Sequence, residues 1–381
     1  MQTNNSLNER NLLLDSLRGY ALTGLFLVHM VELFELYWYQ YKADPLTENV
    51  FLLFGGKVYA ILAMLFGVSF YLIEKNFKAK KSNSEFYNYF FKRSIVLWII
   101  GFFHGLYYGG EILQLLAIAG IFILVVHQLN FKTLLVLSVL LLLQIPYWVF
   151  FTLKVVPHVE LYTQPAHWAL YVPVQEAYAH GSFWDVIQTN FWKTQLSKWA
   201  FMLESGRFSI ILGISLLGYL LGKMEFFDFK KINIQRYLLI TLCAVIVLYN
   251  FVTFKDHFAV LYNFKKYWML DSIYGSYKDL STIILSVGIF CTIYKIEFLQ
   301  KILNYLAPLG KMSLSLYVLQ SLICMPIFYG FGLNGYTFIR SWDALFLGVF
   351  FWVLQLIFVN FWLKNHEYGP LEWLWRKLSS N

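Results

Sequence analysis

Long apolar runs recur along the whole chain, and each is close to the roughly 20 residues that a helix needs to cross a hydrocarbon core. Lipid cannot hydrogen-bond exposed backbone groups, so such runs must form helices or closed barrels in a bilayer. The runs are continuous rather than alternating, which excludes a barrel. Charged residues make up only 14% of the 381 residues, against about 25% in a typical soluble domain. The sequence therefore predicts an all-α polytopic membrane protein.

The apolar runs predict about ten transmembrane helices. They lie at residues 12–37, 50–73, 94–108, 112–127, 133–151, 208–221, 237–254, 273–294, 313–331 and 344–363. The loops after the second, sixth and eighth runs and the tail after the tenth are rich in Lys and Arg. These residues accumulate on the cytoplasmic side of membrane proteins. We therefore expect both termini in the cytoplasm of a multi-pass protein of the cell inner membrane, with the lipid bilayer as its partner.

We interpret residues 1–381 as a single transmembrane domain in three parts. N-terminal helices occupy residues 11–155, an extracytoplasmic segment occupies 157–205, and C-terminal helices occupy 206–381. The middle segment contains several tryptophans, which favour the membrane–water interface. We therefore expect this segment to lie against the membrane surface.

Composition and motifs exclude several classes of function. The formal net charge of +8 is explained by the basic loops, and no soluble region is large enough to present a basic face to nucleic acid. The three cysteines lie far apart in apolar runs and lack metal-ligand spacing, so no metal site is predicted. There is no phosphate-binding glycine loop, dinucleotide fingerprint or nucleophile elbow. Any chemistry must therefore come from polar residues inside the apolar runs.

The first apolar run carries four ionisable residues on one face. At about 100° per residue, Asp15, Arg18, His29 and Glu32 share a stripe about 100° wide. Asp15 and Arg18 are one turn apart and are expected to pair, whereas His29 lies about 16 Å further along the axis with Glu32 one turn beyond it. Ionisable residues inside the membrane mark functional interiors by default. The alternatives are a buried ion pair that joins helices and a core histidine.

The third apolar run repeats this spacing. Arg93 and His104 are eleven residues apart, as Arg18 and His29 are, and Lys92 precedes Arg93. Glu111 falls on the same face only if the helix continues through Gly109–Gly110, and a glycine pair usually ends a helix.

Several segments together resemble those of the YeiB-like, DUF418-containing bacterial membrane proteins. The segments are LDSLRGYA at residues 14–21, LFGV at 65–68, GFFHG at 101–105, GEIL at 110–113, LGKMSLSLYVLQS at 309–321 and GPLEWLWR at 369–376. This group is itself similar to transmembrane acyltransferases of the heparan-glucosaminide N-acetyltransferase and acyltransferase-3 groups. The resemblance implies transfer of an acyl group from cytoplasmic acyl-CoA, as donor substrate, to a small-molecule or envelope glycan acceptor.

On this hypothesis the polar residues divide into a catalytic set and a donor-binding set. His29 is the expected general base or a transiently acylated nucleophile, Glu32 orients it, and His104 and Glu111 complete the site. Arg18 with Asp15, Lys92 and Arg93 is expected to hold the phosphates of acyl-CoA, and no metal is required. The alternative is a transporter or export partner for a small polar solute, in which the same stripe forms a substrate or proton path.

Overall fold

The computed structural model describes residues 11–39, 42–79, 82–153, 165–228, 233–262 and 268–380, and every regular element in these ranges is a helix. The helices of the first half are α1 (Leu12–Val31), η1 (Leu33–Trp38), α2 (Pro45–Leu53), α3 (Val58–Lys78), α4 (Asn83–Tyr107), α5 (Leu113–Val126), α6 (Phe131–Leu142), α7 (Ile145–Leu153), α9 (Ala166–His180), α10 (Phe183–Thr189), η2 (Asn190–Thr194) and α11 (Gln195–Glu204). The remaining helices are α12 (Arg207–Lys223), α13 (Ile234–Tyr262), α14 (Trp268–Tyr294), α15 (Glu297–Asn304), α16 (Ala307–Lys311), α17 (Ser313–Phe328), η3 (Gly335–Thr337), α18 (Ser341–Asn365) and α19 (Pro370–Ser380).

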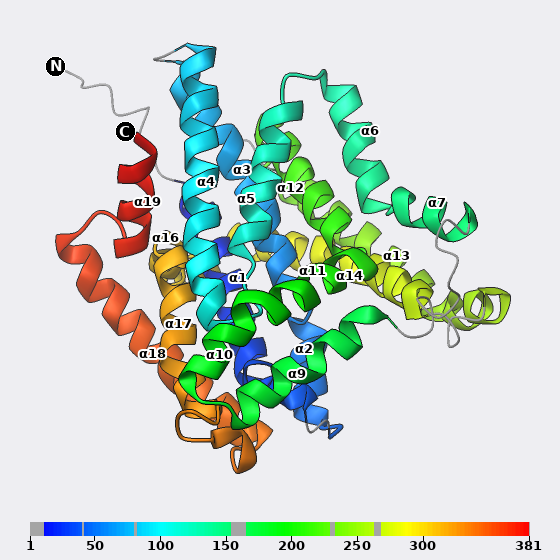
Figure 1. Cartoon of the computed structure of the whole chain (residues 1–381). Helices are drawn as coiled ribbons and strands as arrows, with labels where there is room; N and C mark the ends of the chain where they lie inside the picture. Colours follow the sequence, from blue (N-terminus) through cyan, green and yellow to red (C-terminus); the bar gives the residue numbers. More distant parts are fainter. Residues whose placement is uncertain are drawn as a thin grey trace.

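Helix α1 lies inside the bundle, in contact with α3, α16, α17 and α18 (Figure 1). The start of α1 lies next to α16, because the backbone of Asp15 approaches Gly310 closely. The start of α17 is bonded to α19 through Ser315 and Glu372. We call this end of the molecule the α19 end, and the opposite end, with η1, α2 and α9, the η1 end.

Local sequence signals set both ends of α1. The side chain of Asn11 accepts a hydrogen bond from the backbone N–H of Leu14, which satisfies one of the free donors of the first turn. At the other end, Leu33, Phe34 and Glu35 have φ values of 48°, 47° and 87°. Non-glycine residues rarely adopt this region, and it cannot continue a right-handed helix. The chain therefore turns sharply where the polar stripe of α1 ends.

Two glycines let α3 and α12 cross at backbone contact. A Cβ atom on Gly67 would lie 1.8 Å from the carbonyl oxygen of Ser215, and one on Gly218 would lie 1.9 Å from that of Met64. Small residues at helix crossings permit this close approach in membrane proteins, where dispersion contacts replace the hydrophobic effect between helices.

Each of the ten predicted spans is helical over most of its length in the described ranges. Among the described residues, four stretches are long and apolar enough to cross a membrane: Leu12–Trp38, Pro45–Lys78, Asp271–Tyr294 and Ser341–Asn365. The pair Phe183–Glu204 and Arg207–Lys223, bent by 70°, would make a fifth if it forms one span. Most of the other predicted spans are shorter apolar helices, so the count of ten stays a prediction.

Two predicted spans differ from the structure in shape. The second predicted span is divided between α2 and α3 at Gly55–Gly56, where Gly56 has a φ of 72°. The fifth is divided between α6 and α7 at Gln144, which has a φ of 54°.

The described part of the predicted extracytoplasmic segment is helical. Residues 165–204 contain α9, α10, η2 and α11, and these helices contact η1, α4 and α12. Their placement against the membrane surface stays a prediction.

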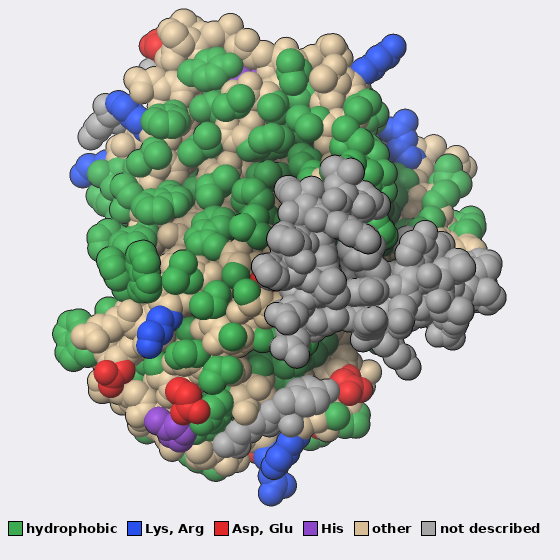
Figure 2. Space-filling model, turned by 45° about the vertical axis from the view of Figure 1, so that its right-hand side comes forward, with side chains coloured by type: hydrophobic (Ala, Val, Ile, Leu, Met, Phe, Trp, Pro, Cys, Tyr) green, Lys and Arg blue, Asp and Glu red, His purple; other side chains and the backbone are tan. Residues whose placement is uncertain are grey.

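The outer surface is apolar over the middle of the molecule. Hydrophobic side chains cover the middle of the face in Figure 2, and most charged side chains lie toward its upper and lower ends. On α18, the side chains of Phe346, Phe350, Ile357 and Phe361 are each more than half exposed. Such a large exposed apolar surface is typical of contact with lipid.

Helix α19 caps the start of α17. The Glu372 carboxylate accepts hydrogen bonds from the backbone N–H groups of Leu314, at 2.8 Å, and Ser315, at 3.2 Å, and from the Ser315 hydroxyl. The first N–H groups of a helix have no partner inside it. A carboxylate from the C-terminal helix, 58 positions beyond Leu314, thus satisfies the start of α17.

Replacing Glu372 by alanine is expected to lower the free energy of unfolding by about 1–3 kcal/mol, because several donors lose a charged acceptor. The melting temperature in detergent, followed by intrinsic fluorescence, measures this change. The matched control is Glu367→Ala, since Glu367 is exposed and bonds to the adjacent Tyr368. Equal melting temperatures for the two variants would contradict the capping role.

Candidate functional site

His29 lies at the η1 end of α1 beside Tyr108, which follows α4. Its Nδ1 atom is 3.1 Å from the Tyr108 hydroxyl and 3.8 Å from a Glu32 carboxylate oxygen. The ring of His29 also contacts that of Phe34, with centroids 5.3 Å apart. The predicted proximity of His29 and Glu32 on α1 is therefore confirmed, and Tyr108 is an additional partner.

His104 reaches the same tyrosine from α4. Its Nε2 atom is 2.7 Å from the hydroxyl of Ser321 on α17, and its ring centroid is 5.9 Å from that of Tyr108. The centroids of His29 and Tyr108 are 5.4 Å apart. The two histidines of the sequence pattern thus converge on one aromatic ring. We call His29, Glu32, Glu35, His104, Tyr108 and Ser321 the polar cluster.

Each imidazole keeps one ring nitrogen without a partner. His29 Nε2 and His104 Nδ1 are buried, and neither has a hydrogen-bond partner among the described residues. Nearly all buried polar atoms in proteins are hydrogen-bonded, and exceptions point to a function or to a small bound molecule. The two nitrogens can accept a proton from, or donate one to, a molecule that enters the cluster.

Glu35 joins the cluster through the break after α1. The Tyr171 hydroxyl donates a short hydrogen bond to one Glu35 oxygen. A Cβ atom on Gly110 would lie 2.4 Å from the other oxygen and 2.3 Å from the Tyr108 hydroxyl, so a glycine is needed there. In a continuous helix Glu35 would point about 100° away from Arg18, off the polar stripe. The sequence pattern therefore did not identify it.

Glu111 lies beyond the end of α4, and its role is local. Helix α4 ends at Tyr107, and the Glu111 carboxylate accepts hydrogen bonds from the backbone N–H groups of Leu113 and Gln114 at the start of α5. Lys198 of α11 lies within electrostatic range of Glu111, and its ammonium group donates to the Gln114 side chain at 2.5 Å. The helix does not continue through Gly109–Gly110, as the glycine pair indicated, so His104 and Glu111 do not lie on one face of a continuous helix.

Helices α9 to α11 close the polar cluster at the η1 end. Asn190 donates to the last carbonyl groups of α4, those of Leu106 and Tyr107, at 3.0 and 3.1 Å. The ring of Tyr178 stacks on that of Tyr329 at 4.5 Å, and Tyr329 donates to the carbonyl oxygen of Phe34 at 3.3 Å. These contacts bury the cluster under the segment that precedes α12.

The four predicted donor-binding residues lie toward the α19 end. Arg18 forms an ion pair with Asp15 and donates to the Ser69 hydroxyl, both at 2.9 Å, so the predicted pairing on α1 is confirmed. Arg93 is buried, and its guanidinium lies 3.5 Å from the ring centre of Trp375 on α19. Lys92 precedes it on α4 and is partly exposed.

The predicted residues therefore fall into two groups, one around Tyr108 and one toward the α19 end. Arg18 and Asp15 are about three and about four helical turns from His29 on the same helix, and Arg93 is held in the contact between α4 and α19. The side chain of Arg18 is 21% exposed, whereas that of Arg93 is buried against Trp375. Within the described ranges, no group of three or more His, Cys, Asp or Glu residues is arranged to hold a metal ion.

An all-helical chain with several apolar helices of membrane-crossing length, an apolar outer surface and a buried polar cluster has the features of a helical membrane protein. Residues 221–381 match the sequence model of the family described as "Protein of unknown function (DUF418)". The C-terminal part of the chain is therefore similar to the DUF418 family, and the chain is similar to the YeiB and YxaH proteins.

Three relatives show this similarity. The "Uncharacterized 39.9 kDa protein in amylase 3'region" of Bacillus acidopullulyticus is 25% identical over 381 residues, which cover 99% of this chain and 95% of the relative. The "Uncharacterized protein YxaH" of Bacillus subtilis (strain 168) is 25% identical over 405 residues, covering 97% and 94%. The "Uncharacterized protein YeiB" of Escherichia coli (strain K12) is 38% identical over 82 residues, covering 21% and 20%. No solved structure matches the chain.

Proposed function

We propose that this protein is an integral-membrane acyltransferase that moves an acyl group from cytoplasmic acyl-CoA to a cell-envelope acceptor. The observation that carries the proposal is the convergence of His29 and His104 on Tyr108, each with a buried ring nitrogen that has no partner in the described part of the chain. A histidine with a free nitrogen is the commonest general base near neutral pH.

The proposal includes a topology of ten spans in an inner membrane, with the α19 end in the cytoplasm. The start of α1 and helix α19 lie at the same end of the molecule. This supports the placement of both termini on the same side of the membrane. Arg18 would then bind a phosphate of acyl-CoA at the cytoplasmic side, and the flexible acyl-bearing arm would extend along α1 over the roughly 16 Å to His29.

In the proposed reaction, a free imidazole nitrogen of the cluster removes the proton from an acceptor hydroxyl or amine. The acceptor atom attacks the thioester carbonyl carbon, the new C–O or C–N bond forms, and the C–S bond breaks. The CoA sulfur leaves as a thiolate and takes the proton back from the imidazolium, so protons and electrons balance. The Glu32 carboxylate stabilises the positive charge of the His29 imidazolium. The Tyr108 hydroxyl orients the His29 ring through its contact with Nδ1.

Transport of a small polar solute is the second candidate function. The observation that favours it is a pair of carboxylates away from solvent: Glu35, half-buried in the cluster and bonded to Tyr171, and Glu111, which is buried close to Lys198. Buried acidic and basic groups inside a helical membrane protein commonly form proton relays. A transporter needs a gradient but no thioester, which separates the two proposals.

The deciding experiment measures release of CoA by the purified protein in detergent. The protein is incubated with acetyl-CoA or longer acyl-CoAs and an envelope extract as acceptor. Free CoA is quantified by mass spectrometry rather than with a thiol dye, because Cys243 is exposed and would react with the dye. We expect CoA release that depends on the acceptor. No binding and no release with any acyl-CoA, from well-folded protein, would overturn the acyltransferase proposal in favour of transport.

A further inference from the structure

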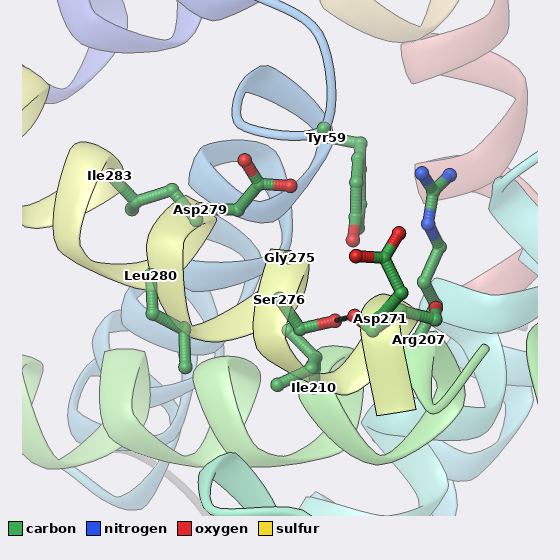
Figure 3. Close-up of a pocket in the computed structure, with 11 residues that line it drawn as sticks. Tyr59, Arg207, Ile210, Asp271, Gly275, Ser276, Asp279, Leu280 and Ile283 are labelled. Atoms are coloured by element: carbon green, nitrogen blue, oxygen red, sulfur yellow. Dashed lines mark hydrogen bonds between the residues drawn. The ribbon is translucent and has the colours of Figure 1, made fainter. Parts of the chain in front are cut away.

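A second polar cavity lies between α3, α12 and α14, and no residue of the polar cluster lines it. Its volume is about 210 Å³. This is below the roughly 300–1,000 Å³ of pockets for drug-sized ligands, so the cavity fits a molecule of amino-acid or headgroup size. Figure 3 shows its charged side chains, Arg207, Asp271 and Asp279, around the ring of Tyr59.

The cavity offers a guanidinium that has no acidic partner. No carboxylate in the described ranges forms an ion pair with Arg207, although Glu204 precedes it by only one turn. Glu204 is instead bonded to His167 at 2.6 Å. The guanidinium of Arg207 lies 4.7 Å from the ring centre of Phe201 and 5.6 Å from that of Tyr59. Ring contacts leave the N–H edge of an arginine available, and this edge matches the oxygens of a phosphate or carboxylate.

The same cavity offers a carboxylate that has no basic partner. Asp271 forms no ion pair with any residue that the structure describes, whereas Asp279 is 3.4 Å from the ammonium group of Lys57. The hydroxyls of Ser272 and Ser276, which line the cavity, donate to backbone carbonyl groups, so each hydroxyl oxygen can still accept a hydrogen bond. Asp271 and these hydroxyl oxygens together can accept the three hydrogens of a primary ammonium group.

Two positive charges, on Arg207 and Lys57, balance the two negative charges of Asp271 and Asp279 around the cavity. A ligand with a net charge would leave either Arg207 or Asp271 without an opposite charge. A ligand with one oxyanion and one ammonium group would pair both Arg207 and Asp271. We propose that this cavity binds a small zwitterion of the phosphoethanolamine type, with its phosphate on Arg207 and its ammonium on Asp271.

This ligand chemistry has two sources, a free metabolite and the headgroup of a zwitterionic phospholipid. Most of helix α14, Asp271–Tyr294, is long and apolar enough to cross a membrane, and the proposed topology therefore places the cavity beside lipid. One experimental arm titrates the detergent-purified protein with glycerophosphoethanolamine, which carries one phosphodiester charge and one ammonium charge, by calorimetry. Inorganic phosphate and ethanolamine are the anion-only and cation-only probes. The other arm compares melting temperatures in nanodiscs of phosphatidylethanolamine and of phosphatidylglycerol.

The test variants are Arg207→Gln and Asp271→Asn, and the matched controls are the exposed Arg236→Gln and Glu297→Gln. Each test variant is expected to weaken binding by about 10–100-fold through the loss of one charged hydrogen-bonding partner. Each control is expected to bind as the wild type does. Asp271 is exposed and makes no ion pair among the described residues, so its variant should keep the wild-type melting temperature even if loss of the Arg207 ring contacts lowers stability.

Binding of glycerophosphoethanolamine that both test variants weaken supports a free zwitterion. Stabilisation only in phosphatidylethanolamine nanodiscs, lost in both variants, supports a lipid headgroup. The proposal is overturned if neither arm shows binding, if the variants bind as the wild type does, or if inorganic phosphate binds equally well and Asp271→Asn has no effect. None of these outcomes depends on CoA release.

Discussion

Replacing His29 by alanine is expected to lower the rate of CoA release by about 10²- to 10⁴-fold, the usual contribution of a general base. His29 is the histidine that combines a free ring nitrogen with a nearby carboxylate, Glu32 at 3.8 Å, and a hydroxyl partner, Tyr108. Loss of the imidazole removes the group that takes the acceptor proton. His104→Ala is expected to have an effect in the same range, because its ring contacts the same tyrosine.

Two further variants separate catalysis from folding. His29→Asn keeps a hydrogen-bonding side chain beside Tyr108 but cannot act as a base, so it should fold normally and remain as slow as His29→Ala. His366→Ala is the matched control, because this histidine is exposed near the end of α18 and stacks on Trp362. If the two histidines act as a unit, the double alanine variant should be little slower than either single variant. Wild-type rates in His29→Asn would contradict the assignment of His29 as base.

Replacing Gly67 or Gly218 by leucine is expected to destabilise the protein by about 3 kcal/mol or more, the upper range for overpacking a core. Even the first added carbon would lie within 2 Å of a backbone carbonyl oxygen of the opposite helix. A backbone atom cannot move aside as a flexible side chain can, so α3 and α12 must separate along their crossing. The melting temperature in detergent and the yield of monodisperse protein measure this effect.

Gly275 provides the control for this substitution. It lies within α14, and a Cβ atom added there meets no atom within 4 Å. Gly275→Ala should therefore leave the melting temperature unchanged or raise it slightly, since alanine favours a helix by about 1 kcal/mol over glycine. A Gly67→Ala variant as stable as Gly275→Ala would show that the α3–α12 crossing tolerates a side chain.

The helices and the contacts within a single helix were predictable from the sequence. Helical periodicity placed Asp15 beside Arg18 and His29 beside Glu32, and both proximities are present in the structure. Each predicted span is helical over most of its length because apolar length is a local property of the chain. The divisions at Gly55–Gly56 and at Gln144 were not predicted, since tertiary packing decides whether such positions adopt a positive φ.

The contacts between helices were not predictable in the same way. Ser321 of α17 bonds to His104 over 217 positions of sequence, and no local pattern links the two. Lys198 was missed because it lies in the segment that we expected on the membrane surface. Arg93 has another contact between helices that no local pattern predicts. Its spacing from His104 matched that of Arg18 from His29, but Trp375 covers its guanidinium.

The hydrogen bond between His104 and Ser321 has a consequence for how such proteins are divided into modules. The DUF418 region begins at residue 221, so it contributes the serine, whereas both imidazoles come from the preceding helices. A protein reduced to residues 221–381 would contain Ser321 but neither His29 nor His104, and it would therefore lack the proposed base. Fusion or shuffling at residue 221 should therefore yield an inactive protein unless both halves are present in the same membrane and reassemble.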